Sequence, residues 1–89
     1  MQILVHKGSA GDVRVYPRDV FCEAIRWRAA AVIVAHNHPS GDPAPSRDDL
    51  AVTRRLVEAS VVVGIPLLDH LILGRTDFIS LRESGDVAF

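Results

Sequence analysis

Two histidines, a serine and an aspartate have the spacing that a catalytic metal site requires. His36 and His38 end an apolar run, and residues two apart in an extended segment point to the same side. Ser46 follows a proline-rich loop, and Asp49 lies three residues further, on the same face of a helix that begins there. Imidazole and carboxylate groups bind Zn²⁺, and three protein ligands leave the fourth tetrahedral position for water, as in catalytic zinc sites. The spacing therefore predicts a zinc site made by His36, His38 and Asp49.

The same stretch also allows a simpler interpretation. Ser46 with Asp49 is a variant of the capping box, which needs no metal. The preceding HNHPSGDP could be only a polar turn between a strand and a helix. The whole combination, however, falls where a strand ends and a helix begins, and α/β folds place ligands at such junctions. This position favours the metal site.

The elements expected around the site alternate between strand and helix. The apolar run at 30–35 is β-branched and uninterrupted, as in a strand that is covered on both faces. Ser46 is a suitable N-cap for a helix that runs to about Val63, with Gly64 as its C-terminal stop. Further strands are expected at 2–6, 13–16, 65–73 and 78–81, a further helix at 17–30, and a loose or edge segment at 82–89. The order β-β-α-β-α-β-β predicts an α/β fold, a small mixed sheet layered with two helices.

The first helix is expected to bury several large side chains. Pro17 suits the first helical turn, where its missing N–H costs nothing. Phe21, Cys22 and Trp27 lie within the helical pattern, and we expect all three in the core. A single cysteine also excludes an internal disulfide.

Length and composition limit the kinds of protein that the chain can be. A chain of 89 residues with 48% hydrophobic residues predicts one domain, over residues 1–89, with a packed interior. The formal net charge of -1 offers no basic surface for nucleic acid. No apolar stretch approaches the length that spans a bilayer, and the first residues lack the features of a signal peptide. We therefore expect a cytoplasmic protein without a membrane or nucleic-acid partner.

Taken together, these motifs resemble those of a known family. His36-x-His38-x₇-Ser46-x₂-Asp49 resembles the JAMM motif of the MPN-domain metallopeptidases. Three longer stretches resemble the C-terminal domain of the bacterial RadC family, over about residues 8–84: VYPRDVFCEAI, AAAVIVAHNHPSGDPAPS and LLDHLILG.

The resemblance implies a fold, a cofactor and an activity. The fold would be the deaminase-like architecture of MPN/JAMM domains, and His36, His38 and Asp49 would bind zinc. Ser46 would be the catalytic residue that orients the water and helps to hold the developing oxyanion. The implied activity is hydrolysis of a peptide or isopeptide bond in a peptide or protein substrate. The family name also refers to DNA repair, which the charge of this chain does not support.

The chain departs from the family pattern near its beginning. The family has a glutamate on an early strand, a few residues before a turn that here is Gly8-Ser9, whereas this sequence has Ile3 and Leu4 there. Without that carboxylate, the site lacks an evident group for proton transfer. Two alternatives follow: the chain is a truncated form of a longer protein, or it is a catalytically impaired metal-binding interaction module.

The first strand and the second half of the chain give two further expectations. If the chain starts at Met1, strand 2–6 lies at an exposed sheet edge, and such edges pair with other chains. We therefore expect a homodimer through this strand. The pair Asp69-His70 is shared with the family, and the favoured role for His70 is support of the ligands rather than direct ligation.

Overall fold

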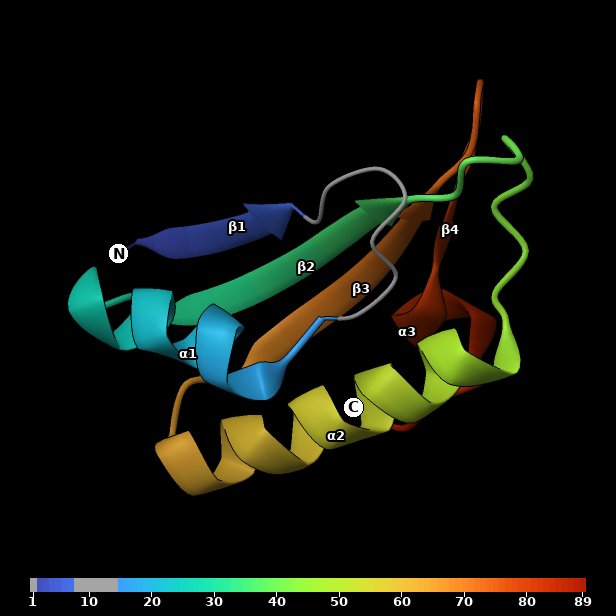
Figure 1. Cartoon of the computed structure of the whole chain (residues 1–89). Coiled ribbons are helices and arrows are strands. Elements are labelled where there is room, and N and C mark those ends of the chain that lie inside the picture. The colour runs from blue at the N-terminus through green and yellow to red at the C-terminus, as the bar shows by residue number, and fades with distance from the viewer. Residues whose placement is uncertain (1, 8–14) are drawn as a thin grey trace.

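Four strands and three helices make up the described part of the chain in the computed structural model, which covers residues 2–7 and 15–89. In chain order these are β1 (Ile3–Lys7), α1 (Pro17–Arg26), β2 (Ala31–Asn37), α2 (Arg47–Val63), β3 (Leu67–Leu73), β4 (Phe78–Ser80) and α3 (Leu81–Ser84), as Figure 1 shows. None of the helices in these ranges is long and apolar enough to cross a membrane.

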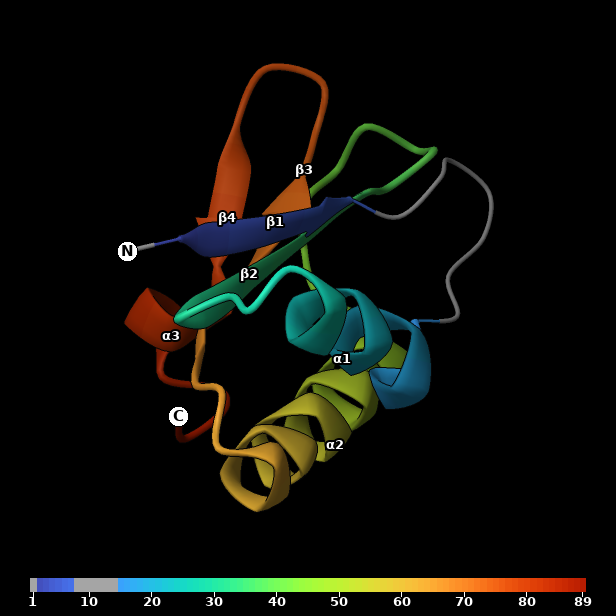
Figure 2. The ribbon, with the colours of Figure 1, turned by 90° about the vertical axis from the view of Figure 1, so that its left-hand side faces the viewer.

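The strands form a single mixed sheet in the order β1-β2-β3-β4. β1, β2 and β3 run parallel, and β4 returns antiparallel to β3. α1 and α2 lie side by side along one face of the sheet, while α3 packs near β3 and β4 (Figures 1 and 2). The structure thus confirms the α/β class and the small mixed sheet layered with helices.

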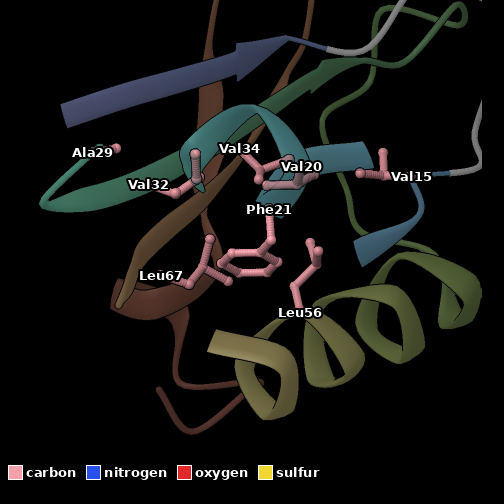
Figure 3. Packing of buried hydrophobic residues seen from close by; sticks show 9 residues of the cluster. Val15, Val20, Phe21, Ala29, Val32, Val34, Leu56 and Leu67 are labelled. Carbon is pink, nitrogen blue, oxygen red and sulfur yellow. The ribbon is translucent and has the colours of Figure 1, made fainter. Parts of the chain in front are cut away.

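The core lies between the sheet and the two long helices. β2 contributes Val32 and Val34, both fully buried, as the uninterrupted apolar run predicted. α1 buries one face, and Phe21 extends from it toward Leu56 on α2 (Figure 3). The cluster shown in Figure 3 consists of Val15, Val20, Phe21, Ala24, Ala29, Val32, Val34, Leu56 and Leu67.

The beginning and end of α1 differ from the prediction. The strand expected at 13–16 lies partly outside the described residues, and Val15 and Tyr16 belong to no strand, because Tyr16 is already the N-cap of the helix. α1 ends at Arg26 rather than at residue 30, and Trp27 is 59% exposed. Trp27 lies past the last helical residue, so its side chain no longer follows the buried face. The prediction that Trp27 is in the core was therefore wrong.

Cys22 was also predicted to be buried, and it is exposed. Successive helical residues are turned by about 100°, so Cys22 points away from the face that buries Val20 and Ala24. Phe21, by contrast, is in the core as predicted.

The segment after β4 is more ordered than the sequence analysis expected. Ser80 caps α3, because its Oγ accepts the N–H of Glu83 at 3.1 Å. Beyond this helix, Val87 is buried and Phe89 packs against the core cluster. The pattern Ser-x-x-Glu, a capping box, was the signal that the prediction of a loose segment missed.

Candidate metal centre

Three residues from three consecutive segments meet at one edge of the sheet. His36 belongs to β2, His38 begins the loop 38–46, and Asp49 lies in the first turn of α2. One ligand atom from each residue can be chosen so that all three lie within 4.8 Å of one another. The structure therefore brings together the three residues that the sequence predicted as ligands, in a cluster that could bind a metal ion.

The capping box and the candidate metal site were alternative interpretations of the sequence, and in the structure they share Asp49. Ser46 is the N-cap of α2, and its Oγ accepts the N–H of Asp49 at 3.1 Å. In return, the backbone N–H of Ser46 donates to Asp49 Oδ2 at 2.7 Å. The cap thus holds the Asp49 carboxylate in one orientation, beside both histidines.

His36 presents a nitrogen that lacks a partner. Its side chain is 3% exposed, and its Nδ1 lies 2.8 Å from Nε2 of His70. Its Nε2 is buried, 3.1 Å from Asp49 Oδ1, yet it has no hydrogen-bond partner among the described residues. A buried polar atom without a partner is costly, and a metal ion would supply the missing one. This unpartnered nitrogen is therefore suited to bind a metal cation.

His38 reaches the same carboxylate from the solvent side. Its Nδ1 donates to the carbonyl oxygen of Asp42 at 2.9 Å, because a carbonyl can only accept. In a neutral ring, Nε2 then offers a lone pair, and it lies 2.9 Å from Asp49 Oδ2. A lone pair and a carboxylate repel each other unless a proton or a metal cation lies between them. His38 therefore fits the same cation as His36.

The protonation states of His36 and Asp49 also suit metal ligation. Burial lowers the pKa of His36, although the Asp49 charge partly opposes this. Burial by itself would raise the pKa of Asp49, but hydrogen bonds with Ser46 and the two nearby imidazoles outweigh it and lower that pKa. A neutral imidazole and an ionised carboxylate are the forms that bind metals.

His70 and Thr53 lie directly behind the ligands. Both are fully buried, and Thr53 Oγ1 lies 2.6 Å from Nδ1 of His70. Burial, followed by the neighbouring His36, lowers the pKa of His70 to about 4. His70 contacts His36 and lies outside the candidate ligand cluster, which is the position that the supporting role expected for it requires. Thr53 was missed, and its only signal in the sequence is its position one helical turn after Asp49.

The other two acids near the motif, Asp42 and Asp48, contribute to the local structure rather than to the cluster. The Asp42 carboxylate accepts the N–H of Ala44 at 3.0 Å and so shapes the loop 38–46. Asp48 is exposed in the first turn of α2, where it favours the helix dipole.

Comparisons with known proteins agree with the motif. The family model of the RadC-like JAB domain matches residues 2–86. A UPF0758 protein of Bacillus cereus (strain B4264) is 55% identical over 80 residues, which cover 90% of this chain and 36% of that protein. A UPF0758 protein of Pelobacter propionicus is 50% identical over 84 residues, which cover 94% of this chain and 37% of that protein. The chain thus spans little more than a third of the length of these relatives. Its RadC-like motifs, its mixed sheet and its match to the family model over nearly the whole chain together show that it belongs to the RadC-like JAB domain family.

Proposed function

We propose that this domain is a zinc-dependent hydrolase that cleaves a peptide or isopeptide bond. The observation that carries the proposal is the pair of imidazole Nε2 atoms that face the two oxygens of a buried carboxylate. His36, His38 and Asp49 would hold the ion. Two nitrogens and one carboxylate oxygen form a ligand set that zinc accepts and that leaves room for water. When bound, zinc supplies a Lewis acid that polarises a carbonyl group and activates water near neutral pH.

The surroundings of His38 would admit a substrate. A shallow hollow adjoins this residue, between the loop 38–46 and the turn that follows β3. Pro39 and Leu73 give it apolar walls, and Arg75 gives it a positive charge at one side. An extended peptide chain would fit such an open hollow better than a small molecule that requires enclosure.

Ser46 would be the catalytic residue beside the metal. Its Oγ uses a lone pair to accept the N–H of Asp49, so its own proton stays available for donation. It also sits at the N-terminus of α2, where the helix dipole favours negative charge. A hydroxyl donor at this position would stabilise a developing oxyanion and orient the attacking water.

A metal-binding interaction module without hydrolysis is the second candidate. Among the described residues, Asp49 supplies the one carboxylate of the cluster. Its oxygens already contact the backbone N–H of Ser46 and the imidazoles of His36 and His38. A carboxylate committed to ligation does not transfer protons. This engagement favours the module, in which the same three ligands would hold zinc for a structural purpose.

The dimer expected from the sequence remains a proposal. β1 is an outer strand of the described sheet, and Ile3 and Val5 on it are 49% and 61% exposed. Pairing of two β1 edges would satisfy the backbone groups of the outer edge and bring the exposed side chains of the two copies next to each other. Light scattering should therefore give twice the monomer mass, and Val5→Lys should shift the protein toward the monomer. A monomer at high concentration would contradict this proposal.

The function is tested by loading the protein with zinc and measuring two properties together. Zinc binding is measured by calorimetry, and hydrolysis is measured on an unfolded polypeptide and on an isopeptide-linked conjugate. The proposal expects binding and chelator-sensitive cleavage, both lost in His36→Ala. Zinc binding without cleavage would support the interaction module instead, and the absence of binding would contradict both candidates.

A further inference from the structure

We propose that Thr53 and His70 are positioning residues that fix the tautomer of His36, so that its Nε2 presents a lone pair to the metal. The inference rests on the zinc site of the proposed function, but not on hydrolysis. The residues come from three elements, since Thr53 lies on α2, His70 on β3 and His36 on β2. Their side chains form one continuous series of hydrogen bonds through the core.

The series starts from a hydroxyl that has one proton to give. Thr53 Oγ1 donates to the backbone carbonyl of Asp49 at 2.7 Å, one helical turn earlier. The same oxygen lies 2.6 Å from Nδ1 of His70. Because the single hydroxyl proton is already used, the oxygen accepts in this second bond. His70 must therefore carry its proton on Nδ1.

The tautomer of His70 in turn determines the tautomer of His36. It is fully buried, and its two ring nitrogens contact a hydroxyl and an imidazole rather than a carboxylate. A charged ring there would lack a direct counter-ion, so the ring is neutral and its one proton stays on Nδ1. Nε2 of His70 then has a lone pair and accepts from Nδ1 of His36 at 2.8 Å. In a neutral His36 ring, Nε2 is thereby left without a proton.

The opposite assignment, with each ring proton on the other nitrogen, can be tested against the same interatomic distances. If Thr53 donated to His70, each proton would move to the other nitrogen, and Nε2 of His36 would donate to Asp49 Oδ1. Those two atoms are 3.1 Å apart, yet Nε2 forms no hydrogen bond with the described residues. The reversed order would also remove the Thr53 hydroxyl from the Asp49 carbonyl, to which it lies at 2.7 Å. Both observations favour the order in which Nε2 of His36 is ready to bind a metal.

This arrangement joins two ligands through the interior of the domain. Thr53 is bonded to the backbone of Asp49, and His70 is bonded to the ring of His36. A buried acceptor behind a ligating imidazole fixes the ring orientation as well as the tautomer, and loss of such a partner typically weakens metal affinity by about 10–100-fold. The Thr53 hydroxyl should thus affect zinc binding, although it is not a ligand.

Zinc affinity in matched variants tests the inference. Thr53→Val keeps the shape of the side chain and removes the hydroxyl, so zinc should bind about 10–100-fold more weakly. Thr53→Ser keeps the hydroxyl and should restore most of the affinity. Ser60→Ala is the control, because Ser60 makes a similar bond to the carbonyl of Val57 on the same helix, away from the site. Affinity is measured by competition with a chromophoric chelator. A folded Thr53→Val protein that binds zinc as tightly as the unchanged protein would overturn the inference.

Imidazole nitrogen NMR of the unchanged, metal-free protein provides a test that depends on neither folding of a variant nor zinc binding. We expect protons on Nδ1 of both His36 and His70. A proton on Nε2 of His70 would overturn the inference, whatever the result with zinc. If the tautomers are as expected but no peptide is cleaved, the proposed hydrolysis fails and the positioning role stands.

Discussion

His36 and His38 are separated by one residue, yet different parts of the molecule hold them. The core side of the site consists of His36, His70 and Thr53, and the side chain of His36 is 3% exposed. The loop side consists of His38 and the backbone of Asp42, and the side chain of His38 is 14% exposed. One ligand is thus oriented by buried side chains from two other elements, and the other by the loop that carries it.

The loop side is supported by the turn between β3 and β4. The N–H of His38 donates to the carbonyl of Leu73 at 3.0 Å, and the N–H of Arg75 donates to the carbonyl of Gly41 at 2.9 Å. These backbone bonds attach the loop to the end of β3 and to the exposed turn that follows it, rather than to buried side chains of the core. Loops held by few buried contacts open at lower free energy than core elements do. We therefore expect loss of the metal to affect the loop side more than the core side.

Asp49 joins the two sides, and its replacement should have the largest effect. Asp49→Asn keeps the shape and still allows the Ser46 N–H to be accepted, but it removes the charge that faces both histidines. At zinc concentrations about 1,000 times the dissociation constant, the unchanged protein should gain about 4 kcal/mol of stability. The variant should gain almost none, as measured by thermal unfolding with zinc and with a chelator.

Asp48→Asn is the matched control for Asp49→Asn. Asp48 is the adjacent residue, it is exposed, and it has the same chemistry. The Asp48→Asn substitution should leave the effect of zinc on the unfolding temperature unchanged. If Asp49→Asn were stabilised by zinc as strongly as Asp48→Asn, the two sides would not share a metal through Asp49.

Acid should weaken the core side of the metal-free protein. The pKa of His70 is about 4 in the folded state, against an ordinary value of 6.5. Between these values the unfolded state binds more protons, so the free energy of unfolding falls as the pH falls from 6.5 to 4. The loss from this group approaches about 3 kcal/mol below that range. The lowered pKa of His36 acts in the same direction.

Urea unfolding at several pH values measures this effect, and His70→Gln is the comparison. Glutamine can still accept a hydrogen bond from His36, but it does not titrate. The variant should lose less stability than the unchanged protein over the same pH interval. If the free energy of unfolding fell equally with pH in the two proteins, His70 would not be the buried group that causes the loss of stability in acid.

Gly74→Ala should disturb the loop side. A methyl group at Gly74 would lie 2.7 Å from the carbonyl oxygen of Gly41 and 2.8 Å from Cδ of Pro43. Both atoms belong to the loop 38–46, which must shift to make room. Such overpacking costs about 1–3 kcal/mol, and the shift should also weaken zinc binding through His38.

Gly64→Ala separates displacement of the loop from general loss of stability. Gly64 ends α2 with a φ of 80°, and nothing lies within 4 Å of an added methyl group. This substitution should cost about 1 kcal/mol through backbone strain and leave zinc affinity unchanged. If zinc binding in the two variants fell equally, the turn after β3 would not support the site.

The division between the core side and the loop side also explains which features of the site the sequence could predict. His36, His38, Ser46 and Asp49 lie within one short stretch, and strand alternation and helical spacing are local rules that place them correctly. The contact between His36 and His70 joins residues 34 apart, and it depends on how β2 and β3 align. That alignment includes a register shift between Val32 and Ile33, which no local pattern reveals. The candidate ligands were therefore predictable from local rules, whereas support by His70 was expected only from the family resemblance and support by Thr53 was missed.

Trp27 shows a second limit of local patterns. Its spacing from Val20 and Ala24 fits one helical face, but the chain leaves the helix at that residue to enter β2. The positive φ of 51° at Arg28 marks this turn. Periodicity indicates which face of a helix is buried, and it gives the end of the helix less reliably because tertiary contacts determine where the chain must turn.

Ser46→Ala should have a modest effect on stability and should leave both sides of the site in place. The variant loses the hydroxyl that accepts the N–H of Asp49, so the helix cap weakens by about 0.5–2 kcal/mol. The backbone N–H of residue 46 still donates to Asp49 Oδ2, so the carboxylate keeps its orientation and zinc affinity should stay within a few-fold of the unchanged protein. Ser40→Ala is the control. Within the described ranges the Ser40 hydroxyl accepts one long bond of 3.3 Å, from the N–H of Asp42, and its loss should change stability by less than about 0.5 kcal/mol. Calorimetry on the two variants measures stability and zinc binding together. Loss of zinc binding in Ser46→Ala would mean that the hydroxyl, rather than the backbone, orients Asp49, and that the cap is part of the ligand support on both sides.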